Sequence, residues 1–120
     1  FEIKFVWNDF FKTSLKKEYD GIYLLDVLEH IPSSKEDLFL GNIKNSLKEN
    51  GQIIVGMPSL ESQEHASKES KQGHINCKKA SELKITLKSF FKHVNIFSMN
   101  DEVLHTGFAP MSHYLIALCS

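Results

Sequence analysis

An apolar segment that leads directly into acidic and imidazole side chains sets the expected fold class of this sequence. Residues 20–25, Asp-Gly-Ile-Tyr-Leu-Leu, are nearly all apolar, as in a parallel strand that is buried on both faces. They are followed by Asp26, Glu29 and His30, at the spacing i, i+3 and i+4. If the chain turns helical after residue 25, this spacing places all three side chains on one helical face. Open α/β sheets bind ligands at the carboxyl ends of their strands, so we expect a site at this turn.

The rest of the sequence continues an alternation of strands and helices. Strands are expected at residues 2–7, 20–25, 52–57, 94–99 and 113–119. The last strand is expected at an edge or hairpin position. It follows the previous strand without a helix between them. The pattern predicts a single α/β domain over residues 1–120.

Two helices are expected between these strands. The first begins near Ser33 with serine caps and acidic residues in its first turn, and it stops at Asn50-Gly51. It should turn Leu38, Ile43 and Leu47 inward. The second covers residues 79–91, where Leu83, Leu87, Phe90 and Phe91 have amphipathic spacing. Residues 59–73 are polar and predict a mobile loop or a short irregular helix.

Composition excludes several classes of function. The chain has 120 residues with 42% hydrophobic content, enough for one modest core. Fourteen lysines against 15 acidic residues leave a net charge of -1, so we expect neither nucleic acid nor a membrane surface as a partner. There is no arginine, which weakens a nucleotide-triphosphate interpretation. Two isolated cysteines and no apolar run near the roughly 18 residues of a membrane span favour a cytoplasmic protein.

Several short motifs, taken in order, are similar to one known family. They are Asn8-Asp9, the segment from Tyr19 to His30, Leu47-Lys48-Glu49-Asn50-Gly51 before an apolar strand, Met57-Pro58, and Gly73-His74 before a helix. Together they resemble the second half of class I S-adenosylmethionine-dependent methyltransferases, in particular small-molecule members. The resemblance implies a Rossmann-like three-layer sheet, mostly parallel with an antiparallel last strand, in the strand order 3-2-1-4-5-7-6.

Two motifs of that family have no counterpart in this sequence. These are the glycine-rich first loop, since no two glycines have G-x-G spacing, and the acidic residue that binds the ribose. The sequence also opens at Phe1 in strand-like alternation, without a methionine. We therefore expect a partial methyltransferase domain from a longer protein, inactive by itself, whose first strand lacks its natural neighbours. That exposed strand edge suggests a homodimer.

The resemblance implies methyl transfer to an oxygen or nitrogen nucleophile of a small molecule. Asn8, Asp9, Phe10, Leu25 and Asp26 would bind the cofactor, S-adenosylmethionine, with Asp9 accepting a hydrogen bond from the adenine amino group. An aspartate after a strand can instead form a simple Asx turn. His74 would be the catalytic residue, as a general base. It can equally cap the following helix or lie at the rim of the site.

Asp26, Glu29 and His30 could also bind a metal, with Mg²⁺ the expected ion and His74 the fourth ligand. In the family that the sequence resembles, some O-methyltransferases with this turn use it to bind a metal. The alternative is that Asp26 contacts the cofactor while Glu29 and His30 only tie the turn to the next loop. A zinc site of His65, His74 and Cys77 is rejected, because the spacing fits no closed site.

Two further functions remain open. A degenerate half of a methyltransferase could serve as a non-catalytic α/β scaffold or dimerisation module, which the missing glycine-rich loop favours. A metal-dependent hydrolase could use Asp26, Glu29 and His30 with a bound water.

Overall fold

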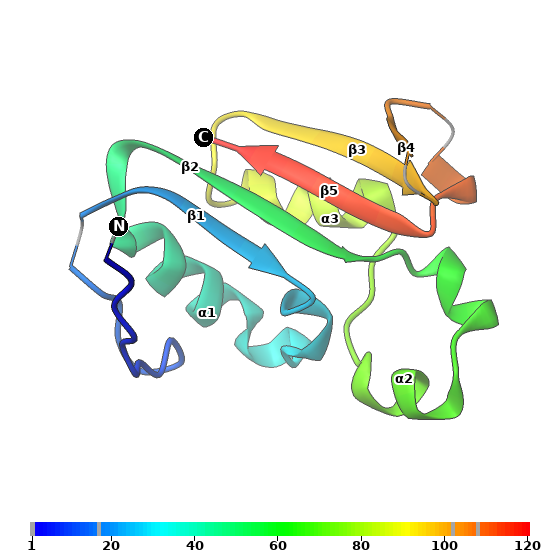
Figure 1. The fold of residues 1–120 in the computed structure, drawn as a ribbon, viewed down its shortest axis with the longest axis horizontal. Coiled ribbons are helices and arrows are strands. Elements are labelled where there is room, and N and C mark those ends of the chain that lie inside the picture. The colour runs from blue at the N-terminus through cyan, green and yellow to red at the C-terminus, as the bar shows by residue number, and fades with distance from the viewer. Residues whose placement is uncertain (1, 17, 102, 108) are drawn as a thin grey trace.

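A computed structural model of the chain describes residues 2–16, 18–101, 103–107 and 109–120. Its centre is a five-stranded sheet in the order β1-β2-β5-β3-β4 (Figure 1). The strands are β1 (Tyr19–Leu25), β2 (Leu47–Pro58), β3 (Val94–Asn100), β4 (Val103–His105) and β5 (Tyr114–Cys119).

Strand directions agree with the predicted sheet. β1 and β2 are parallel, whereas β5 lies between β2 and β3 and is antiparallel to both. β3 therefore runs in the same direction as β1 and β2. The order β1-β2-β5-β3 reproduces the last four strands, 4-5-7-6, of the order that the resemblance implies.

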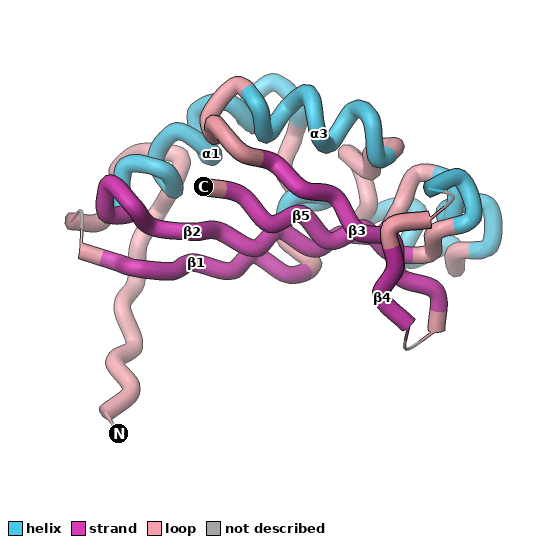
Figure 2. Tube along the Cα trace, turned by 90° about the horizontal axis from the view of Figure 1, so that it is seen from above, coloured by secondary structure: helices cyan, strands magenta, loops and turns pink. Residues whose placement is uncertain are grey.

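Helices cover one face of this sheet. α1 (Ser33–Ser46) and α3 (Ala80–Lys88) lie side by side on it, and the core fills the space between them and the strands (Figure 2). Fully buried core residues include Leu40, Ile53, Val55, Met57, Leu83, Leu87 and Leu115. Among the residues described, no helix has both the length and the apolar character to cross a membrane.

Short helices gather near the carboxyl end of β2. They are η1 (Leu28–His30), η2 (Glu61–His65) and α2 (Lys68–Gly73), with η3 (Ala109–Met111) before β5. The segment of residues 59–73, predicted as a mobile loop or a short irregular helix, thus contains two short helices, and it lies where a site is expected.

The opposite face of the sheet carries no helix in the described part of the chain (Figure 2). Along β2, Ile53 and Val55 are fully buried while Ile54 between them is 42% exposed. Tyr23 on the neighbouring strand is 74% exposed. The sheet and one helical layer of the expected three layers are therefore present, as in a partial domain.

The strand predicted at residues 2–7 is not formed. Residues 2–7 have no regular structure, and Phe5 and Trp7 are 96% and 89% exposed. Apolar alternation produces a strand only when a neighbour supplies the hydrogen-bond ladder. β1, the nearest edge, is paired with β2 alone in the described residues.

The first helix differs from its prediction at both ends. It ends at Ser46 and not at Asn50-Gly51, because residues 47–51 join β2, where Tyr19 pairs with Leu47. Its N-cap is Pro32, and no serine side chain caps it. Ile43 and Leu47 are buried as predicted, but Leu38 is 52% exposed, and Phe39 and Leu40 face the core in its place.

The last two strands also differ from the prediction. β5 is an interior strand and not an edge, because β2 and β3 both pair with it. The edge is β4, a short strand that pairs with β3 through Val103, Leu104 and His105 and that the sequence pattern did not reveal. Its three residues are too few to show a period of two.

Candidate functional site

The turn after β1 begins with a residue in a left-handed conformation. Asp26 has φ 54°, and its N–H donates to the carbonyl of Gly56 at 3.0 Å, which extends the β1–β2 pairing by one residue. Asparagine and aspartate tolerate this region better than other non-glycine residues do. The 3₁₀ helix η1 then covers only Leu28–His30. Asp26 therefore does not share a helical face with Glu29 and His30, and that part of the prediction is wrong.

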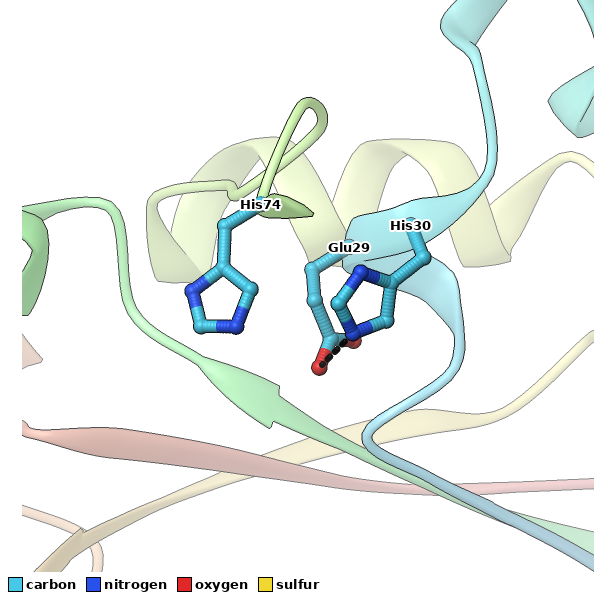
Figure 3. Close-up of side chains that lie close together, drawn as sticks. All are labelled: Glu29, His30 and His74. Carbon is cyan, nitrogen blue, oxygen red and sulfur yellow. Dashed lines mark ion pairs between the residues drawn. The ribbon is translucent and has the colours of Figure 1, made fainter. Parts of the chain in front are cut away.

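Glu29 and His30 instead converge with a residue from a distant segment. One ligand atom from each of Glu29, His30 and His74 lies within 4.8 Å of the others (Figure 3). His74 follows α2, and backbone contacts hold its segment against the turn. The N–H of Asn76 donates to the carbonyl of Glu29 at 2.9 Å. Below, the Glu29 cluster means Glu29, His30 and His74.

Glu29 is the buried member of the Glu29 cluster. Its side chain is 0% exposed, and neither carboxylate oxygen has a hydrogen-bond partner among the described residues. The nearest opposite group is Nε2 of His30, at 3.7 Å from Oε1. Burial raises the pKa of Glu29 above its ordinary value, and His30 opposes this only in part. A buried carboxylate without a partner calls for a proton or a cation.

Both histidines are oriented by their other ring nitrogen. Nδ1 of His30 lies 2.8 Å from the carbonyl oxygen of Gly73, and Nδ1 of His74 lies 2.9 Å from Oε1 of Gln63. Those oxygens can only accept, so both Nδ1 atoms carry the proton. In a neutral ring Nε2 then has a free lone pair, which is the arrangement that outer hydrogen bonds impose on metal-binding or proton-accepting imidazoles.

A buried ion pair lies behind the Glu29 cluster. Nζ of Lys78 is 3.2 Å from Oε2 of Glu36, and these side chains are only 12% and 8% exposed. Asn76 bridges them, because its Nδ2 donates to Glu36 at 2.6 Å and its Oδ1 accepts from Lys78 at 3.2 Å. This network joins α1 to the segment that carries His74. Sequence patterns do not indicate this network, because its members are far apart in the chain.

Leu25 and Asp26, two of the predicted cofactor residues, lie together at the carboxyl end of β1 beside Tyr114. Burial and the neighbouring Asp26 raise the pKa of Tyr114 above its ordinary value. Gly56 makes room for this ring, since a Cβ there would lie 2.8 Å from Tyr114 Oη and 2.7 Å from Leu25 Cδ2. Tyr114 was not predicted, because only strand pairing brings β5 to this edge.

The other predicted cofactor residues form a turn that packs on α1. Oδ1 of Asp9 accepts from the N–H of Phe11 at 3.0 Å, which is the Asx turn weighed above. Asn8 donates to the carbonyl of Thr13 at 3.1 Å, and Asn42 of α1 donates to the carbonyl of Phe10 at 2.8 Å. These bonds show a local role. Contact of Asn8, Asp9 and Phe10 with a cofactor stays a prediction.

A cavity of about 450 Å³ adjoins His74. Pro58, Ala66 and Tyr114 line it, together with Gln63, His65 and His113. Cys77, near Glu29, is not a candidate nucleophile, because burial and the Glu29 carboxylate raise the pKa of its thiol to about 11.

Comparison with known proteins identifies the fold. No protein-family model matches the sequence, and no curated protein matches it. A SAM-dependent methyltransferase from Thermotoga maritima matches the structure with a TM-score of 0.72 at 14% identity, over 94% of this chain and 61% of that one. DhpI in complex with SAM and HEP matches with a TM-score of 0.65 at 14% identity, over 98% and 57%. The small RNA methyltransferase HEN1 matches with a TM-score of 0.70 at 16% identity, over 93% and 15%.

These matches confirm the fold that the resemblance implied. The chain has the class I SAM-dependent methyltransferase fold, as a partial domain that spans less than two thirds of the length of each of these structures. Its antiparallel β5 between β2 and β3 is the feature of the sheet that carries this assignment.

Proposed function

We propose that this chain forms the acceptor side of an S-adenosylmethionine-dependent methyltransferase that modifies an oxygen or nitrogen of a small molecule. One observation carries the proposal: the free Nε2 of His74 and the unpaired Glu29 carboxylate converge at the carboxyl edge of a sheet ordered β1-β2-β5-β3. In open α/β sheets this edge holds the ligand.

Leu25 and Asp26 are the residues that fit the cofactor best. Asp26 is exposed at the very end of β1, and Leu25 is 48% exposed beside it on the face without helices. The Asp9 turn would add a contact to the adenine. When bound, S-adenosylmethionine supplies a methyl group on a sulfonium, so the protein's work is alignment and exclusion of water.

His74 is proposed as the proton acceptor. Nε2 of His74 would take the hydroxyl proton of the acceptor as its oxygen gains the methyl group. Bound S-adenosylmethionine would supply that methyl group and would leave as S-adenosylhomocysteine. Gln63 holds Nδ1 of His74 in the required tautomer, and the Glu29 carboxylate stabilises the imidazolium that forms.

Calorimetry with S-adenosylhomocysteine tests the cofactor half of the proposal. We expect no tight binding by these 120 residues, because the described residues would hold the cofactor from one side only, and binding by a longer protein in which a glycine-rich first loop completes the site. Asp26→Ala in the longer protein should weaken binding about tenfold. Unchanged affinity in Asp26→Ala, or tight binding by the 120 residues alone, would contradict this assignment.

A divalent cation at the Glu29 cluster is a second candidate, favoured by the unpaired carboxylate of Glu29. One carboxylate and two imidazole nitrogens leave positions open for water or an acceptor oxygen, and Mg²⁺ is the expected ion. Asp26 is not a member of the cluster, so its place as a ligand stays a prediction. The two roles exclude each other at one nitrogen, because a His74 Nε2 that binds a cation cannot take a proton.

Titrating Mg²⁺ and Mn²⁺ into chelator-treated protein distinguishes the two roles. The cation is supported if the unmodified protein binds the metal and Glu29→Ala does not. The control variant Glu64→Ala, at an exposed residue, should still bind it. Absence of binding by the unmodified protein would leave His74 as the base. It would also remove the hydrolase alternative, which needs a metal-bound water.

The partner proposed is therefore a small-molecule acceptor, with self-association along the free edge of β1 as a further proposal. The scaffold alternative predicts self-association without methyl transfer even in the longer protein. Measuring transfer from radiolabelled cofactor in the longer protein decides between them.

A further inference from the structure

The cavity beside His74 is lined by uncharged polar, imidazole and apolar side chains. It lies between the end of β2, the segment of residues 62–70 and the start of β5, and we call it the His65–His113 cavity. His74 belongs both to its wall and to the Glu29 cluster. A molecule in this cavity would therefore lie against the group proposed to accept the proton.

No lysine, aspartate or glutamate lines the His65–His113 cavity in the described part of the chain. A permanently charged molecule would lose water there without gaining an opposite charge. Flat apolar surfaces are present instead, from Pro58, Ala66 and the ring of Tyr114. Aromatic ligands gain most from such walls, through buried area and ring contacts.

Several polar groups in this lining are already bonded. Gln63 holds His74, the hydroxyl of Ser62 donates to the carbonyl of Ser59 at 2.8 Å, and the hydroxyl of Ser70 accepts from that of Ser67 at 3.1 Å. The imidazoles of His65 and His113 make no hydrogen bond to any residue that the structure describes. These two rings can each donate to or accept from a hydroxyl group without placing a fixed charge beside it.

The volume sets the size of the occupant. A cavity of roughly 150 Å³ accommodates one benzene ring. The His65–His113 cavity, at about 450 Å³, has room for one or two fused rings with a polar substituent.

We infer that the His65–His113 cavity is the acceptor site and that the acceptor is a small, uncharged aromatic molecule bearing a hydroxyl group. This rests on the proposed function for the identity of the reaction, but binding to the cavity does not depend on it. His65 and His113 are specificity residues that hold the hydroxyl and ring, and His74 faces the nucleophile.

A binding titration by NMR, with no S-adenosylmethionine present, tests the inference. The probe is 2-naphthol, and 2-naphthoate is its charged counterpart. We expect 2-naphthol to shift the amide signals of Ala66 and Tyr114 and to bind at least tenfold more tightly than 2-naphthoate. His65→Phe and His113→Phe keep a flat ring but remove the nitrogens, and each should weaken 2-naphthol binding about five- to tenfold.

His93→Phe is the matched control, since His93 is an exposed residue that does not line the cavity. Its affinity for 2-naphthol should be unchanged. Circular dichroism of each variant shows whether it folds, and Ala66→Trp, which fills the cavity, should abolish binding in a folded protein.

Equal affinity for 2-naphthol and 2-naphthoate, shifts confined to other surfaces, or no binding would each overturn the inference. Its failure is distinguishable from that of the proposed function. Binding of 2-naphthol to a longer protein that never transfers a methyl group would refute only the function. Methyl transfer to a molecule that leaves the Ala66 and Tyr114 signals unmoved would refute only the cavity.

Discussion

At the scale of single residues, burial gives the Glu29 carboxylate properties that the other acidic residues in the described part of the chain do not share. In the sequence it is one of 15 acidic residues, whereas in the structure it is fully buried with both oxygens unpaired. The free energy of its ionised form is raised, which is why its pKa lies above the ordinary 4.5. The group is therefore poised to take up a positive partner, whether an imidazolium or a cation.

The raised pKa predicts a pH-dependent stability in the presence of chelator. The folded state holds the Glu29 proton more tightly than the unfolded chain does, so the destabilisation is absent below pH 4.5 and develops as the pH rises towards the folded pKa. Glu29→Gln removes this titration. We expect its free energy of unfolding, relative to the unmodified protein, to increase with pH above 4.5, measured by urea denaturation at several pH values.

The exposed Glu64→Gln is the control and should stay within about 0.5 kcal/mol of the unmodified protein at every pH. A difference between Glu29→Gln and the unmodified protein that does not change with pH would show that Glu29 titrates alike in the folded and unfolded states.

At the scale of elements, the segment between α2 and α3 is held by a buried ion pair. Lys78 contacts Glu36 of α1, and the N–H of Leu60 donates to the carbonyl of Lys78 at 2.9 Å. Asn76 lies within the same network and also binds the backbone of Glu29. Because His74 belongs to this segment, the network places His74 against Glu29.

Lys78→Met should cost about 3 kcal/mol of unfolding free energy, because it leaves the Glu36 carboxylate buried without its cation. Chemical denaturation measures this. Lys48→Met is the matched control, since the Lys48–Asp20 pair has the short distance of 2.8 Å but side chains that are 49% and 85% exposed, and its loss should cost less than about 1 kcal/mol. Equal effects in the two variants would mean that the Lys78 pair is no stronger than a surface pair.

At the scale of the whole molecule, the face of the sheet without helices is apolar. Tyr23 lies beside Ile54, which lies beside Leu118, in a row across three strands. The next row on this face joins Leu25 through Gly56 to Ile116. Contiguous exposed apolar surface of this kind marks an interface, and β1 adds an unpaired strand edge in the described part of the chain.

We therefore predict that the isolated chain self-associates. Sedimentation velocity should show an average mass that rises with concentration, and the double variant Tyr23→Lys/Ile54→Lys should shift the distribution to the monomer. Ile85→Lys is the control, because Ile85 is 70% exposed but belongs to α3. Association that Ile85→Lys disrupts equally, or a chain that stays monomeric, would argue against this face as the interface.

Local patterns predicted those parts of the fold whose neighbours are near in the sequence. The strands β1, β2 and β3 and the helix α3 were recognisable because the apolar pattern of each lies within one continuous segment of the sequence. The Asp-x-x-Glu-His turn likewise placed Glu29 beside His30 and at the end of a strand. The resemblance added His74 as a partner, and the structure brings it to that position.

What the amino-acid order alone determined, then, is the set of periodic elements, the α/β class and the chemical groups at the turn after β1. Tertiary structure decided that residues 2–7 form no strand, that β5 is interior, that Asp26 has a left-handed conformation outside η1, and that Gln63, Tyr114 and His113 share a cavity with His74. The physical reason is that hydrogen-bond ladders, burial and imidazole tautomers depend on which distant segments become neighbours. The periodicity of a segment indicates which of its faces is apolar, whereas tertiary packing determines which distant segment contacts that face.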